Sequence, residues 1–204
     1  MHLETARQRL SVCPDLEGQA RRTAGLVLEA AKLLRLPGPA ELAAAAYLHD
    51  LGKAMWPPEL FTKHSLNEQD WVYIQAHPVM GENMAAELWP GVPAAARAAI
   101  QGHHERPGGK GYPDGLAEPP VEALLVAAAD ALDAMTHERP YRPGGALPVE
   151  AALIEIARWA PAAVVAALAG AVVRGGRLEA GVGNFKTRLL LGRASPVKLK
   201  TKAV

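Results

Sequence analysis

Six residues of this 204-residue chain have side chains that could bind a metal ion together. They are four of the seven histidines and two aspartates: His49, Asp50, His77, His103, His104 and Asp130. Neutral imidazole and carboxylate suit divalent ions such as Fe, Mn, Zn, Co or Ni. Asp130 lies among alanine, leucine and valine, where a carboxylate is costly to bury unless it is paired or bound to a metal. Cys13 is the single cysteine, so neither a thiolate zinc cluster nor an internal disulfide can form.

Each of these residues, taken alone, has an ordinary structural explanation. A His-Asp pair is often a capping feature, and His77 could bond a backbone carbonyl at a helix end. His103 and His104 could mark a helix terminus, where cationic side chains are favoured, and Asp130 could pair with Arg139. The joint order of the residues, with every histidine near a helix end beside glycine, proline or polar loops, favours a metal site.

The elements that must position these residues are expected to be helices. Alanine and leucine dominate, whereas aromatic residues make up 5% of the chain, so the predicted fold class is all-α. Pro78 is predicted to open a new helix, because proline fits the first helical position. The expected helices cover residues 15–36 with Asp15 as N-cap, 39–52, 65–77 with a capping box of Ser65 and Glu68, 78–89, 92–104, 119–135, 146–159 and 160–173.

The organisation along the chain is predicted as an N-terminal extension (1–14), one domain (15–174) and a basic C-terminal tail (175–204). The tail is either a solvated segment or one that binds anions or a partner. Its last part carries six cationic residues and no acid: Lys186, Arg188, Arg193, Lys198, Lys200 and Lys202. The net charge of +1 gives no electrostatic reason to expect a nucleic-acid polymer or a membrane as partner. The charged N-terminus and the single cysteine predict a cytoplasmic protein.

Four motifs together resemble the HD-GYP domain, a subgroup of the HD metal-dependent phosphohydrolases. They are HDLGK (49–53), HPVMG (77–81), HHERPGGKGYPDGL (103–116) and ADALDAMTHERPYRPG (129–144). The resemblance implies a helical bundle that binds two or three metal ions. It also implies hydrolysis of cyclic di-GMP to the linear dinucleotide and, in some members, on to GMP. We therefore expect a metal-dependent phosphodiesterase whose metals are Fe or Mn, with Zn, Co or Ni as alternatives.

The resemblance also implies roles for individual residues. The six residues named first are the implied metal ligands, with Asp50 bridging two metals. Lys53 is expected to assist catalysis at a phosphate oxygen or at the leaving group. Arg106 is either a substrate contact or the partner of Glu105 in a salt bridge. The remaining implied substrate-binding residues are Tyr112, Arg139 and Arg142.

Two departures from the family pattern matter for function. Gln19 stands where the family usually has a histidine, so that ligand position is lost or is filled by water, Asp15 or Glu17. This argues against a third metal ion and predicts reduced activity. Residues 107–110 lack the usual aromatic and acid, which predicts altered substrate handling or an altered partner. Regulation is expected through the short ends, the metal state, oligomerisation or a separate regulatory protein. Two alternatives therefore stand beside the main hypothesis: an HD phosphohydrolase for another nucleotide, and a degenerate domain that binds cyclic di-GMP or a protein without turnover.

Overall fold

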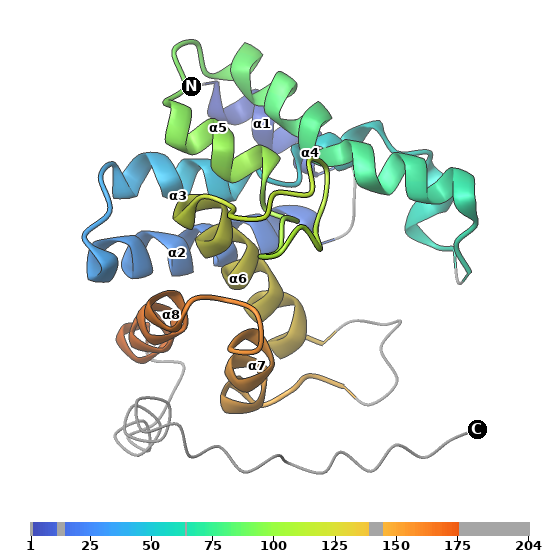
Figure 1. The fold of residues 1–204 in the computed structure, drawn as a ribbon. Coiled ribbons are helices and arrows are strands. Elements are labelled where there is room, and N and C mark those ends of the chain that lie inside the picture. Colours follow the sequence, from blue (N-terminus) through green and yellow to red (C-terminus); the bar gives the residue numbers. More distant parts are fainter. Residues whose placement is uncertain (1, 12–14, 64, 139–144, 176–204) are drawn as a thin grey trace, which may run out of the picture.

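The computed structural model describes residues 2–11, 15–63, 65–138 and 145–175, and these residues form helices with no strand (Figure 1). The predicted all-α fold is confirmed. The α-helices are α1 (Leu3–Leu10), α2 (Leu16–Leu34), α3 (Pro39–Leu48), α4 (Glu68–Leu88), α5 (Ala94–Gln101), α6 (Val121–Thr136), α7 (Val149–Ile156) and α8 (Ala162–Arg174). Two 3-10 helices, η1 (Leu51–Met55) and η2 (Pro58–Phe61), connect α3 to α4.

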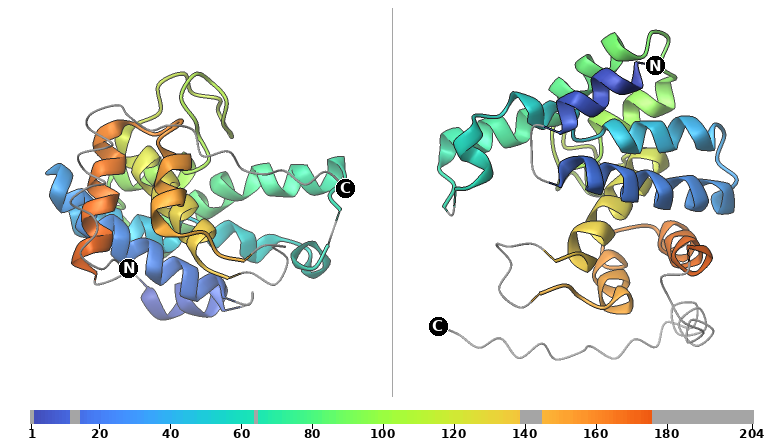
Figure 2. Two further views of the ribbon diagram at one scale, coloured as in Figure 1. Left: turned by 90° about the horizontal axis from the view of Figure 1, so that it is seen from below. Right: turned by 180° about the vertical axis from the view of Figure 1, so that it is seen from behind.

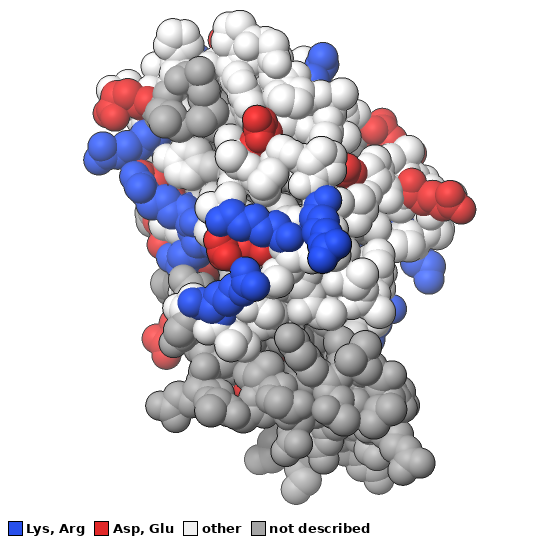
Figure 3. All heavy atoms as spheres, turned by 90° about the vertical axis from the view of Figure 1, so that its left-hand side faces the viewer, with Lys and Arg blue, Asp and Glu red and all other residues white. Residues whose placement is uncertain are grey.

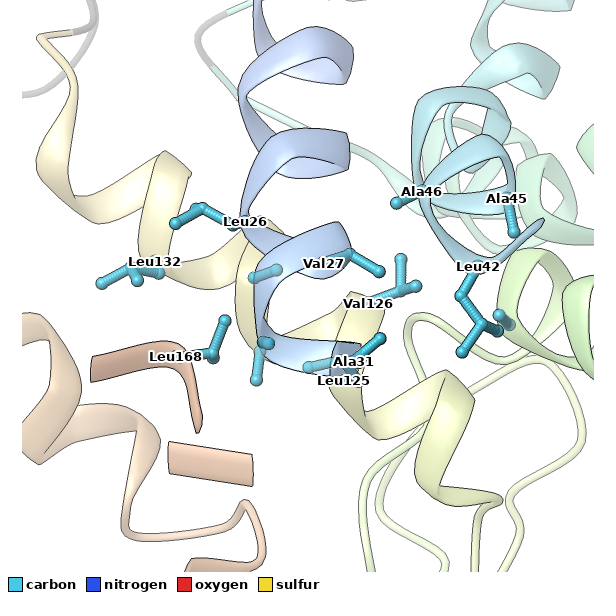
Figure 4. Close-up of a cluster of buried hydrophobic side chains, with 14 of the residues drawn as sticks. Leu26, Val27, Ala31, Leu42, Ala45, Ala46, Leu125, Val126, Leu132 and Leu168 are labelled. Carbon is cyan, nitrogen blue, oxygen red and sulfur yellow. The ribbon is translucent and has the colours of Figure 1, made fainter. Parts of the chain in front are cut away.

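Helix α2 lies at the centre of the bundle and packs against α3, α6 and α8. Leu26 and Val27 of α2 gather with Leu125 and Leu132 of α6 and Leu168 of α8 (Figure 4). All five are buried, and burying each side chain contributes about 1.5–3 kcal/mol. This core fixes α6 against α2, which matters because α6 carries Asp130.

Helix α4 corrects two of the predictions. Its N-cap is Asn67, whose side chain accepts a hydrogen bond from the Asp70 amide at 2.9 Å. The Asp70 carboxylate accepts one from the Asn67 amide at 2.8 Å, so the capping box lies two residues beyond the predicted one. The helix also runs through Pro78 without a break and ends at Leu88. Asn and Asp satisfy the same orphan amides as Ser and Glu, and local patterns did not distinguish the two pairs.

The N-terminal residues take part in the bundle. Helix α1, which lies in the predicted extension, packs against η1, α2 and α4, and its Ala6 and Leu10 have no exposed surface. Asp15 precedes α2 as predicted, but its φ of 61° is left-handed and its side chain caps no amide. Its carboxylate instead accepts a hydrogen bond from Arg22 at 3.1 Å.

The outer surface is mixed in character. The N-terminal half of α4 and η2 project beyond the other helices in both views of Figure 2. On the face drawn in Figure 3, Lys and Arg side chains lie beside Asp and Glu side chains, as the net charge of +1 leads one to expect. Among the described residues, no helix has the length and apolar character needed to cross a membrane.

Candidate metal centre

The structure brings all six predicted ligand residues together in two groups that share Asp50. The first group combines one carboxylate with three imidazoles: Asp50, His77, His103 and His104. The second group is His49, Asp50 and Asp130. In each group, one potential ligand atom per residue lies within 4.8 Å of the others. The contributing segments are the end of α3, the start of η1, the middle of α4, the end of α5 and α6, which come from four separate stretches of the chain.

Three of the histidine rings are oriented by the same kind of hydrogen bond. Their Nδ1 atoms donate to a backbone carbonyl three residues earlier, at 2.6 Å in every case: His49 to Ala46, His77 to Ile74 and His103 to Ile100. Because a carbonyl only accepts, the proton sits on Nδ1 and the lone pair on Nε2 is left for another partner. This is the usual way in which a protein orients a metal-binding imidazole.

The carbonyls that orient these rings are available for a local reason. In a regular helix the Ile74 carbonyl would accept from the amide of residue 78, but Pro78 has no N–H. The His77 ring takes that carbonyl instead. Ala46 and Ile100 lie in the last turns of α3 and α5, where carbonyls lack helical partners. Helix ends and one proline thus determine where the rings point.

The buried charges of the site offset one another. Burial alone would raise the pKa of Asp50, but neighbouring positive charges, His49 first, hold that pKa well below its usual range. Burial opposes protonation of His49, yet the charges of Asp50 and Asp130 outweigh it and raise its pKa to about 10. Burial lowers the pKa of His103 to about 4 and also lowers the pKa of His104. Near pH 7 the centre without metal therefore favours an ionised Asp50, a protonated His49 and neutral His103 and His104. A cation bound at His49 would take the place of that proton, because a ligating imidazole must be neutral.

Two orphaned atoms test whether a metal ion fits. Among the described residues, His49 Nε2 and Asp50 Oδ1 are fully buried without a hydrogen bond. His49 Nε2 lies 3.3 Å from Asp50 Oδ2 and 3.6 Å from Asp130 Oδ1 but bonds neither. The Nε2 atoms of His77 and His103 face each other at 3.1 Å. Buried polar atoms are almost always satisfied, and divalent cations at these nitrogen and oxygen atoms would satisfy them.

Comparison with known proteins agrees with this geometry. Residues 10–158 match the family described as "HD domain". The chain belongs to the HD domain family. This HD domain is 39% identical over 102 residues to the cyclic di-GMP phosphodiesterase response regulator RpfG of Xanthomonas campestris pv. campestris, covering 48% of this chain and 27% of that protein. It is 37% identical over 120 residues to a cyclic di-GMP phosphodiesterase of Thermotoga maritima, covering 57% and 32%.

Further relatives show the same pattern. The HD domain is 36% identical over 115 residues to a 3'3'-cGAMP-specific phosphodiesterase 3 of Vibrio cholerae, covering 55% of this chain and 24% of that protein. The matched region thus spans about a third or less of these relatives' length. Among solved structures, an HDG"Y"P protein from Bdellovibrio bacteriovorus has the same fold, with a TM-score of 0.56 and 23% identity over 74% of this chain and 50% of that one.

Lys53 lies at the wall of the HD-domain centre. Its Nζ donates to Asp50 Oδ2 at 2.6 Å and lies 5.5 Å from the centre of the Trp56 ring. Trp56 is held by a hydrogen bond from its indole nitrogen to the Tyr73 carbonyl at 3.1 Å, and its ring meets His77 edge to face. Trp56 was not predicted as part of the site, because a lone tryptophan near a motif resembles an ordinary core residue.

The loop after His104 is organised by Glu105, which has no exposed surface. Its carboxylate accepts hydrogen bonds from three successive amides: Asp114 at 2.7 Å, Gly115 at 3.0 Å and Leu116 at 2.9 Å. Gly111 packs so closely on the backbone of residues 104–106 that a Cβ there would overlap it. The fold therefore needs glycine at this position. The role of Glu105 could not be predicted from the sequence, because turn amides leave no residue-type signature.

Tyr112 and Arg106, both predicted to contact substrate, have protein partners in this structure. The Tyr112 ring stacks on His104, with ring centres 4.7 Å apart and planes 20° apart. The Arg106 guanidinium lies 4.0 Å from the centre of the Trp159 ring and donates to the backbone carbonyls of residues 103 and 105. The Glu105 carboxylate accepts from amides and Arg106 donates to the Glu105 backbone carbonyl, so the described residues do not show the suggested Glu105–Arg106 salt bridge.

Helix α2 contributes polar contacts to α6. Gln19 donates to Asp130 Oδ1 at 2.5 Å, and Arg22 donates to both oxygens of Asp133 at 2.8 and 3.0 Å. Asp15 and Glu17, suggested as replacements for the missing histidine, pair with Arg22 and Arg21. The remaining predicted substrate contacts, Arg139 and Arg142, lie outside the described residues, as does nearly all of the predicted basic tail.

Proposed function

We propose that this HD domain is a metal-dependent phosphodiesterase that hydrolyses cyclic di-GMP to the linear dinucleotide, with GMP as the further product to be tested for. The observation that carries the proposal is that Asp50 belongs to both ligand groups. A carboxylate shared in this way can bridge two cations, and a pair of divalent cations, when bound, supplies Lewis acidity to a phosphodiester and activates water. We infer His49, Asp50 and Asp130 as ligands of one ion and the remaining group as ligands of the other.

The chain's own residues have defined tasks in this proposal. The three carbonyl-bonded imidazoles present their Nε2 atoms to the centre, so their rings need no reorientation when cations bind. Lys53 stands beside Asp50 with its ammonium 2.6 Å from Oδ2. We assign it to a phosphate oxygen or to protonation of the leaving oxygen, because positive charge is needed where negative charge develops.

We infer Fe or Mn as the metal, since imidazole and carboxylate ligands without thiolate suit these ions, with Zn, Co and Ni as competitors. The names of the relatives support cyclic dinucleotides as the substrate class and make 3'3'-cGAMP the first competitor substrate. The cytoplasmic location and a separate regulatory protein stay predictions.

A purified sample tests the proposal. The protein would be prepared without chelator, its metal content measured, and then incubated with cyclic di-GMP, 3'3'-cGAMP and cyclic di-AMP while linear products are separated by chromatography. We expect two metal equivalents and linear dinucleotide from cyclic di-GMP, and neither from Asp50→Ala. Stoichiometric metal with no product from any substrate contradicts the proposal.

A second candidate function is binding without turnover. The observation favouring it is that Gln19, at the position of the usual histidine, is hydrogen-bonded to Asp130. Equilibrium binding of cyclic di-GMP that persists in Asp50→Ala, with no product from the wild type, selects this candidate. Turnover of a different nucleotide in the same panel selects the third, an HD phosphohydrolase with another substrate.

A further inference from the structure

Gln19 contacts the candidate metal centre from outside its ligand groups. It lies in α2 with 7% of its surface exposed, and its Nε2 donates to Asp130 Oδ1 at 2.5 Å. An ionised carboxylate carries no proton and only accepts, so the amide nitrogen must be the atom that faces it. The same Asp130 oxygen lies 3.6 Å from His49 Nε2. Gln19 therefore bonds an oxygen that also faces the second ligand group.

A second contact one turn along sets the register of the two helices. Arg22 holds both oxygens of Asp133, a carboxylate with no exposed surface. Residues 19 and 22, like 130 and 133, are three apart, so each pair lies on one face of its helix. The bidentate Arg22–Asp133 pair fixes α6 against α2. The Gln19 amide then determines how the Asp130 carboxylate is rotated.

We propose that Gln19 is a positioning residue that holds the Asp130 carboxylate in the orientation that completes the His49, Asp50 and Asp130 group. A neutral amide suits this task, because it orients a carboxylate without adding a charge that would compete with a cation. The inference rests on the metal centre of the proposed function and goes beyond it by assigning one of the two ion sites a partner outside its ligands. Loss of such a partner typically weakens metal affinity about 10–100-fold.

The test compares Mn²⁺ binding by wild type and Gln19→Met, which keeps the side chain's length and shape but has no donor. Calorimetry and the electron paramagnetic resonance signal of coupled Mn²⁺ pairs provide readouts that do not depend on activity. We expect two sites in the wild type. In the variant, one site should weaken about 10–100-fold and the coupled-pair signal should disappear at stoichiometric Mn²⁺, while the other site is retained.

Gln101→Leu is the matched control, because Gln101 also donates to an aspartate, Asp114, at 2.8 Å, but on the exposed surface. We expect it to keep both sites. If Gln19→Met does not fold, Gln19→Asn decides, since its amide is too short to reach Asp130 and the same weakening is expected. Two unweakened sites in the folded Gln19 variant overturn the positioning role and leave the proposed function standing. A wild type that binds fewer than two ions instead contradicts the two-metal centre itself.

Discussion

Replacing Gly52 by alanine tests whether close packing of η1 on α4 positions the metal centre. A Cβ on Gly52 would lie 2.7 Å from the Gly81 amide nitrogen and closer still to the His77 carbonyl oxygen. These are backbone atoms, so no side-chain rotation relieves the overlap. Gly52 is not among the described glycines with positive φ, and the effect of the substitution is therefore steric rather than conformational.

The size of the effect follows from these distances. Bringing the contact with Gly81 to ordinary van der Waals distance requires η1 and α4 to separate by roughly 0.5–1 Å, and the closer contact with the His77 carbonyl oxygen requires roughly 1–1.5 Å. Overpacking of this kind costs about 1–3 kcal/mol of unfolding free energy. Asp50 directly precedes η1, and its Oδ1 lies 3.3 Å from His77 Nε2 on α4. The separation therefore shifts two ligand residues apart, and a misplacement of about 1 Å can reduce turnover ~100-fold.

Two other glycines make the test quantitative. A Cβ on Gly81 would lie 3.1 Å from the Gly52 nitrogen, a tight but smaller intrusion, and one on Gly25 would meet nothing within 4 Å. In urea unfolding of the metal-free proteins, the free energy of unfolding of Gly25→Ala should exceed that of the wild type by about 0.5–1 kcal/mol. Gly81→Ala should fall between wild type and Gly52→Ala. Mn²⁺ titration should show the weakest binding for Gly52→Ala, whereas equal stability of the Gly52 and Gly81 variants, or unchanged Mn²⁺ affinity in Gly52→Ala, would refute the reasoning.

Substitutions at Glu105, Arg22 and Tyr112 probe three further contacts around the centre. Glu105→Ala leaves three loop amides without their acceptor. It should lower the free energy of unfolding, measured in urea, by about 3 kcal/mol or more, since hydrogen bonds to charged groups contribute about 1.5–3 kcal/mol each. Arg22→Met leaves the buried Asp133 carboxylate with His137 Nδ1, at 3.1 Å, in place of a bidentate arginine. It should lower the unfolding free energy by about 3 kcal/mol, the lower end for a broken buried pair, with much of that recovered in the double variant with Asp133→Leu. Tyr112→Phe keeps the stacking on His104 and should retain Mn²⁺ affinity, whereas Tyr112→Ala should lower it; equal affinities would contradict a supporting role for the ring.

The sequence predicted which polar residues lie together at the candidate centre better than it predicted the helices that carry them. His77 before Pro78 suggested a helix boundary, because proline cannot continue the hydrogen-bond ladder. In the structure α4 continues, and the His77 ring takes the carbonyl that Pro78 leaves free. A side chain thus replaces the backbone hydrogen bond that proline cannot make. A rule that considers only backbone hydrogen bonds does not predict that the helix continues.

The contacts that orient the candidate ligands were harder to predict than the grouping of those residues. Gln19 and Asp130 are 111 residues apart in the chain, as are Arg22 and Asp133. No local periodicity connects residues at that separation, so the sequence alone does not pair them. Glu105 is similar, since its partners are the amides of a turn, whose side chains do not reveal where their N–H groups point.

The hydrophobic core and the orientation of the centre depend on the same residues. Ala46 contributes a side chain with no exposed surface to the core around α2, and its carbonyl holds the His49 ring. Ile100 does the same for His103. A larger side chain at Ala46 must push α3 away from its neighbours, because interiors are close-packed, and the carbonyl moves with the helix. Substitutions in this core should therefore weaken metal binding even though they alter no ligand, and the loss should grow with the volume added.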